Sequence, residues 1–189
     1  MGIAIHPTAN LAVVANHKED KVSILDLNTY SVTATIGVGK DPAGVAIDPN
    51  TNTALITNKK DNTLTIIDLS ANTSVNTLPM GADPSSVVIN SASRRAFISN
   101  EKGDSVTVID LDTQTLIGEI QVGQNPHGVD VNPDTHTLVV TNEKEDQISI
   151  IDLDSILFTT TSPTGDKPQG VAIDTLQTWR SLPMRRATM

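Results

Sequence analysis

The chain has 189 residues, a formal net charge of -9 and only 2% aromatic residues. This length suffices for one domain with a substantial core, which Val, Ile, Leu and Ala must build because aromatic side chains are scarce. The negative charge disfavours nucleic-acid binding, and the absence of Cys excludes disulfides and thiolate metal sites. No apolar run approaches the ~20 residues of a membrane span. The start "MGIAIHPTAN" lacks the features of a signal peptide.

A repeat with a period of 42 residues runs through the chain. The motif "GVAIDP" starts at Gly44, and its counterparts "GIAIHP", "SVVINS", "GVDVNP" and "GVAIDT" start at Gly2, Ser86, Gly128 and Gly170. One Asn closes the second apolar stretch of each unit: Asn16, Asn58, Asn100 and Asn142. One Asp closes the third stretch: Asp26, Asp68, Asp110 and Asp152. No insertion or deletion breaks this register through residue 170.

Each unit is predicted to form four short strands, which in the second unit cover roughly residues 45–47, 54–57, 63–67 and 74–78. Polar or Gly/Pro-containing turns separate these strands. The stretch "TLTII" alternates polar and apolar residues, as a half-buried strand does, whereas "GVAI" is apolar throughout and is expected to be covered on both faces. No segment has helical periodicity.

Four antiparallel strands in each unit of this length are typical of a β-propeller blade. We therefore expect an all-β propeller with blades at residues 2–43, 44–85, 86–127 and 128–169, and the first strand of a fifth blade at 170–174. An incomplete, open ring is favoured over a compact four-bladed ring. An open ring would expose apolar blade faces and promote self-association.

The stretches "ITN" and "VTN", the strands of the "TVID" type and the motif "GVAIDP" resemble the repeat of the YVTN-family β-propellers over residues 2–174. The Tyr of that motif is replaced by Val13, Leu55, Phe97 and Val139. The resemblance implies that the "GVAID" strand is innermost and lines a central channel. It also implies kinship with seven-bladed, lactonase-like propellers, whose full-length members are commonly periplasmic, secreted or on the cell surface. The compartment of this chain itself stays open.

Residues 175–189 do not follow the repeat. In register, residues 178–184 should resemble "NLAVVAN", but they read "TWRSLPM". A codon string for "NLAVVAN" read one base out of frame translates as "TWRSLPM", and its continuation "EKSDN" becomes "RRATM". We therefore hypothesise that a one-base deletion near codons 174–177 put this tail out of frame. Restoring one base in the DNA should regenerate "NLAVVAN".

The residues that recur in every unit are interpreted as structural. The four Asn residues are expected to bond backbone groups in the turn after the second strand, since Asn tolerates left-handed geometry. The four Asp residues are expected to accept turn N–H bonds. Gly44 and its counterparts allow close approach where blades converge. The acidic loops "NHKED", "NKKDN", "NEKGD" and "NEKED" are interpreted as solvated hairpin turns.

One position that varies between units is the more informative candidate for binding. It lies between the Pro and the residue that opens the innermost strand, and it is occupied by Ala43, Ser85, His127 and Gln169. By resemblance, these four slot residues lie near the channel mouth. His127 is a candidate ligand or proton carrier. His6, His17 and His136 fall at unrelated repeat positions, so no metal site is predicted.

Together these features favour a non-enzymatic scaffold that binds a protein or a small molecule through variable loops, without a cofactor. The alternative is a remnant of a lactonase-like or lyase-like propeller enzyme. The polar residues at the slot that could serve such an enzyme are His127 and Gln169.

Overall fold

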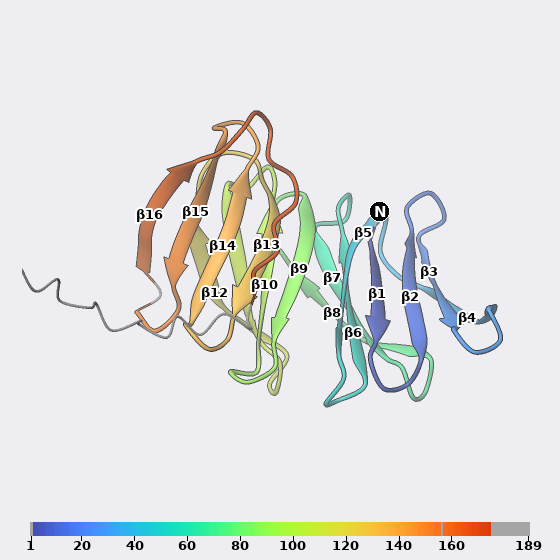
Figure 1. The fold of residues 1–189 in the computed structure, drawn as a ribbon. Coiled ribbons are helices and arrows are strands. Elements are labelled where there is room, and N and C mark those ends of the chain that lie inside the picture. Colours follow the sequence, from blue (N-terminus) through green and yellow to red (C-terminus); the bar gives the residue numbers. More distant parts are fainter. Residues whose placement is uncertain (1, 156, 175–189) are drawn as a thin grey trace, which may run out of the picture.

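The computed structural model describes residues 2–155 and 157–174, which contain four antiparallel sheets and no helix (Figure 1). Each sheet has four strands in chain order, so each is one propeller blade. The all-β propeller fold expected from the repeat is confirmed. No helix in these two ranges is long and apolar enough to cross a membrane.

Blade 1 contains β1 (Ile3–His6), β2 (Leu11–Asn16), β3 (Lys21–Asp26) and β4 (Ser31–Gly37). Blade 2 contains β5 (Pro42–Asp48), β6 (Thr53–Asn58), β7 (Thr63–Asp68) and β8 (Thr73–Pro79). Blade 3 contains β9 (Pro84–Asn90), β10 (Arg95–Asn100), β11 (Ser105–Asp110) and β12 (Thr115–Gln121). Blade 4 contains β13 (Pro126–Asn132), β14 (Thr137–Asn142), β15 (Gln147–Asp152) and β16 (Leu157–Pro163).

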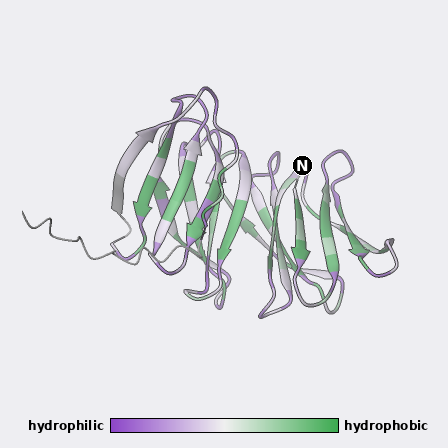
Figure 2. Ribbon diagram, in the orientation of Figure 1, coloured by the Kyte–Doolittle hydropathy of each residue, from purple (hydrophilic) through white to green (hydrophobic). Residues whose placement is uncertain are grey.

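The strands of blade 2 are longer than the sequence pattern predicted, because the ladder continues into the polar residues at both ends of each apolar stretch. Tight turns connect the strands, and several end in a non-Gly residue with a positive φ, such as Asn10, Asp20 and Tyr30. Asn and Asp tolerate this left-handed conformation better than other residues, which accounts for their abundance in the turns. Figure 2 shows the resulting contrast between apolar strands and polar turns.

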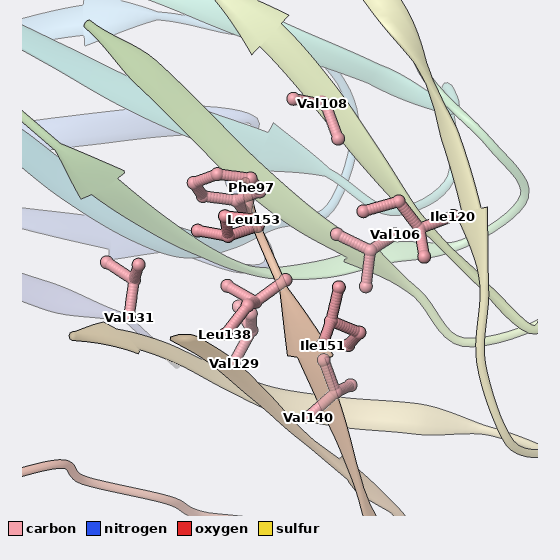
Figure 3. Packing of buried hydrophobic residues seen from close by; sticks show 10 residues of the cluster. All are labelled: Phe97, Val106, Val108, Ile120, Val129, Val131, Leu138, Val140, Ile151 and Leu153. Carbon is pink, nitrogen blue, oxygen red and sulfur yellow. The ribbon is translucent and has the colours of Figure 1, made fainter. Parts of the chain in front are cut away.

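The hydrophobic core lies between the blades rather than within one of them. The cluster at the junction of blades 3 and 4 contains Phe97 and Val106 from one sheet and Leu138, Val140 and Ile151 from the other (Figure 3). Similar clusters fill the other two junctions. Each blade therefore needs its neighbours to bury its apolar faces.

The innermost strands pack in the order β1, β5, β9 and β13, with β1 and β13 in the two outermost blades of the row (Figure 1). The strand "GVAI" is covered on both faces, as expected: Val45 and Ile47 pack against the cluster between blades 1 and 2, and Ala46 packs against the cluster between blades 2 and 3. Its residues are nevertheless only half-buried. This strand has a ladder partner on one edge alone, so its other edge remains partly open. The equivalent Ile3 and Ile5 in β1 are 62% and 61% exposed, because no blade precedes blade 1 in the described chain.

Residues 170–174 run beside β13 but form no ladder and are not a strand. The Ile173 N–H donates to Asp130 Oδ2 over 2.7 Å. This segment lies where the inner strand of a next blade would pack. Residues 175–189, to which the frame-shift hypothesis applies, lie outside the described residues.

Candidate functional site

A pocket of about 370 Å³ lies where the innermost strands begin, and all four slot residues line it. Ala43, Ser85, His127 and Gln169 come from four successive units, so the fold gathers them at one end of the row of inner strands. His17, Lys59 and Glu101 complete its ionisable lining in the described part of the chain. We call this cavity the channel-mouth pocket.

Close contact between adjacent inner strands positions the slot residues. A Cβ placed on Gly44 would lie 2.4 Å from Ser85 O, and one placed on Gly128 would lie 2.4 Å from Gln169 O. Real side chains do not tolerate such distances, so these glycines let the carbonyl group of the next slot residue lie against the strand. The close approach inferred from the sequence is therefore observed at these positions.

A buried hydroxyl group links each of the slot residues Ser85, His127 and Gln169 to the preceding blade. Thr57 Oγ1 accepts the Gly44 N–H over 2.7 Å and donates to Ser85 O over 3.0 Å. Ser99 Oγ donates to His127 O over 2.7 Å, and Thr141 Oγ1 donates to Gln169 O over 3.3 Å. We call these bonds the hydroxyl clips. Ala15 holds the same repeat position in blade 1 and cannot form one.

The charged groups of the pocket bridge three blades. Lys59 Nζ lies 2.8 Å from Glu101 Oε2, and the exposed fractions of the two side chains are 22% and 12%. His127 Nε2 lies 3.6 Å from Glu101 Oε1, and His127 Nδ1 lies 3.2 Å from Gln169 O. Each ring nitrogen of His127 therefore faces an oxygen acceptor. This arrangement holds the imidazole at the pocket and orients it.

The sequence interpretation missed His17, Lys59 and Glu101. These residues were assigned to solvated hairpin turns, but each is the first residue of its turn and lines the pocket. A signal was present in the repeat, because this position changes from His17 to Lys59, Glu101 and Glu143 while the following position is Lys in all four units.

The side chains of the four recurrent Asn residues do not make the expected bonds to backbone groups of the turn. None of them has a positive φ, and their side-chain amides donate to hydroxyl groups of the next strand instead of bonding backbone groups. Asn100 Nδ2, for example, donates to Ser105 Oγ and Thr107 Oγ1 over 3.0 and 2.9 Å. The amide is turned inward because Asn58, Asn100 and Asn142 are fully buried at the end of their strand.

The four recurrent Asp residues accept N–H bonds from the turn that follows them. Asp68 Oδ1 accepts the Ser70 N–H over 2.7 Å, and Asp26, Asp110 and Asp152 make equivalent bonds. These backbone N–H donors hold the pKa of Asp26, Asp110 and Asp152 below the ordinary value. These residues lie away from the pocket lining.

Across residues 2–155 and 157–174, no three side chains of His, Asp and Glu come together in a way that could hold a metal ion. The pocket therefore offers ion pairs, one oriented imidazole and backbone groups as its means of recognition.

The model of the cytochrome D1 heme domain family, whose members are β-propellers, matches residues 47–173. No curated protein sequence matches the chain. Two solved structures are similar, each with a TM-score of 0.79. Hydrazine synthase of Kuenenia stuttgartiensis is 20% identical, and the match covers 85% of this chain and 47% of that one. A functionally unknown protein from Desulfotomaculum acetoxidans DSM 771 is 18% identical, with 92% and 59% covered.

These structural likenesses show the fold alone, and the chain spans about half the length of the structures it matches. The name of the family includes heme, and a heme site needs an axial ligand and an apolar environment for the macrocycle. Ala43, Val129 and Val171 are the apolar side chains among the lining residues, and no Phe, Tyr or Trp is among them. The described pocket therefore lacks the apolar environment that a heme macrocycle requires. By its repeat, its blades and the matched residues, this chain belongs to the cytochrome D1 heme domain family of β-propellers.

Proposed function

We propose that the chain is a non-catalytic propeller scaffold of the YVTN type, which binds a ligand at the channel-mouth pocket. One observation carries the proposal. The scaffold contacts repeat from blade to blade, whereas the slot residue that lines the pocket differs in every unit. A repeated framework that displays varied residues at one cavity is suited to recognition.

The ligand enters beside the Lys59–Glu101 ion pair and contacts His127 and Gln169. The hydroxyl clips fix the backbone of the slot residues, so the pocket is already formed before the ligand arrives. Little conformational entropy is therefore lost on binding. The size of the molecule that binds to the pocket shows whether the natural ligand is a small molecule or a loop of a partner protein.

The test uses a panel of small polar compounds, screened by ligand-observed NMR against the whole chain. Ala43 lies in the pocket lining, so Ala43→Trp should block the pocket and abolish binding. Val75→Trp, on an exposed position of β8 outside the pocket, is the matched control and should leave binding unchanged. Binding that survives Ala43→Trp would contradict the proposal.

A lactonase-like enzyme is the second candidate, favoured by one observation: the His127 imidazole lines the cavity, with Nε2 3.6 Å from Glu101 Oε1. An oriented imidazole can act as a general base. Turnover of a sugar lactone that is lost in His127→Ala would establish this function and exclude the non-catalytic one. Recovery of all bound compounds unchanged supports the scaffold.

A further inference from the structure

A second hollow, of about 400 Å³, adjoins the channel-mouth pocket and shares His17 with it. Its lining comprises His17, Lys18, Asp20, Lys40 and Lys60. Three lysines and one imidazole thus line the hollow together with one carboxylate, and the carboxylates of Asp41 and Asp61 lie beside it. Cations that remain unpaired at such a hollow attract anions.

Three carboxylates near the hollow already have partners within the protein. Asp20 Oδ1 accepts the Asp41 N–H over 3.0 Å, and Asp61 Oδ2 accepts the Lys40 N–H over 2.8 Å. Asp41 pairs with His17, and its Oδ2 lies 3.4 Å from Lys60 Nζ. In the described part of the chain, no ion pair involves the ammonium groups of Lys18 or Lys40. Two cations are therefore available to an anion from outside.

Comparison with the other units shows that Lys40 is specific to the first junction. The position of Lys40 is occupied by Ala82, Gln124 and Asp166 in the later units. The position of Lys18, by contrast, is Lys60, Lys102 and Lys144, and so belongs to the repeat. Lys102 makes the same kind of pair with Asp83 that Lys60 makes with Asp41. Lys40 thus adds, beside a lysine that every unit has, a cation that the other units lack at this position.

We propose that this hollow binds the oxyanion group of a small molecule, a phosphate or a carboxylate, held by Lys18 and Lys40. Lysine ammonium groups bind such anions as point charges. The rest of the molecule extends past His17 into the channel-mouth pocket, and this second part of the proposal rests on the proposed function. The hollow itself is lined only by residues of blades 1 and 2 and of the connection between them.

The test measures binding of inorganic phosphate and of citrate to the whole chain by two-dimensional amide NMR at low ionic strength, about 0.02 M. Lys40→Gln copies the residue of the third unit, and Lys18→Gln removes the second cation. Both side chains are exposed, so both variants should fold. Each should weaken binding by about tenfold, as expected for the loss of one charge-assisted contact.

Lys144→Gln is the control, because Lys144 holds the same repeat position as Lys18, is exposed and lies outside the hollow. It makes the same change in net charge and should alter affinity less than about twofold. Stronger binding of phosphate identifies a phosphorylated ligand, and stronger binding of citrate a carboxylate. An absence of binding, or equal losses in Lys40→Gln and Lys144→Gln, would overturn the proposal.

Ala43→Trp separates this inference from the proposed function. The substitution blocks the channel-mouth pocket but not the hollow, so phosphate should still bind to it. If phosphate binds to this variant while the compound panel binds neither protein, the hollow is an anion site and the proposed function fails alone. If the panel binds and phosphate does not, the hollow proposal fails alone.

Discussion

Hydrogen bonds of single hydroxyl groups connect one blade to the next. The clips at Thr57, Ser99 and Thr141 each use one buried oxygen to satisfy backbone groups of an inner strand and of the next slot residue. A backbone group that loses a buried partner pays a desolvation penalty, so a missing clip is costly. The second letter of "ITN", "ISN" and "VTN" therefore indicates contact between blades rather than strand propensity.

Replacing Thr57 with Val keeps the shape of the side chain and removes the clip. We expect Thr57→Val to lower the free energy of unfolding by about 1–3 kcal/mol, because the Gly44 N–H and Ser85 O lose a shared partner. Urea denaturation, monitored by circular dichroism, measures the free energy of unfolding of each variant. Thr77→Val, at an exposed strand position, should change stability by less than about 0.5 kcal/mol. Equal effects of the two substitutions would show that the clip contributes nothing.

A buried ion pair links blades 2 and 3 on the side of the turns between the first and second strands. Asp48 is 1% exposed and pairs with Arg94, which also lies 2.9 Å from Asp112. Burial raises the pKa of Asp48, but hydrogen bonds from Arg94, Thr51 and the Asn50 N–H outweigh it, and the pKa is lowered overall. The ionised form of Asp48 is therefore favoured in the folded chain.

This lowered pKa predicts a pH dependence of stability. A carboxyl group with a depressed pKa in the folded state stabilises the fold above its unfolded pKa of 3.8, and this stabilisation is lost as the pH falls through the folded value. Asp48→Asn, which copies Asn90 of the next unit, should lower stability at pH 7 and flatten the loss of stability below about pH 4. Urea titrations at several pH values measure both effects. An unchanged acid slope in Asp48→Asn would contradict the assignment.

At the scale of the elements, glycine marks places where the turn between two blades touches a buried side chain. Gly81 lies between β8 and β9, and a Cβ there would be 2.5 Å from the amide group of Asn100. Gly39 and Gly123 lie in the same way over Asn58 and Asn142. The glycine of one unit thus contacts the asparagine of the next unit, 19 residues later in the sequence.

Gly81→Ala should lower stability by about 1–3 kcal/mol, because the new methyl group overpacks a fully buried Asn100. Gly118 in β12 is the matched control, since nothing lies within 4 Å of a Cβ placed there. Gly118→Ala should be neutral or stabilise by about 0.4–1 kcal/mol by restricting the unfolded chain. Thermal unfolding compares the two. Similar destabilisation by both would mean that backbone freedom, not contact with Asn100, explains Gly81.

For the whole molecule, apolar burial comes from the junctions between blades, so an outermost blade face has no cover in the described chain. Ile3 and Ile5 are exposed in β1, whereas Val45 and Ile47 at the same positions of β5 pack against the core of the first junction. An uncovered apolar sheet face favours association.

We expect the chain to self-associate through this face. Replacing Ile3 and Ile5 with Thr should shift sedimentation toward the monomer at a given concentration, since the apolar area that drives association is removed. Val32→Thr with Val75→Thr alters equally exposed residues on outer strands and is the control. Unchanged sedimentation of the Ile3/Ile5 variant would show that the face does not mediate association.

Much of this architecture could be predicted from the sequence, because the same pattern recurs in every unit. The 42-residue register places strands, turns and close-contact glycines in each unit, and four blades follow from it. The roles of individual polar residues were harder to predict. Asn100 was expected to bond turn backbone but points inward to Ser105 and Thr107, because it lies at the buried end of its strand. Burial of that kind depends on the neighbouring blade, which local patterns do not report.

The sequence by itself determined the blade, its four strands and the existence of a variable slot at Ala43, Ser85, His127 and Gln169. The tertiary structure alone decided which other residues join that slot. His17, Lys59 and Glu101 begin turns that resemble solvated loops, yet the packing of inner strands brings them to the same cavity. The physical reason is that periodicity encodes contacts along the chain, whereas a pocket is made by the angle at which separate blades meet.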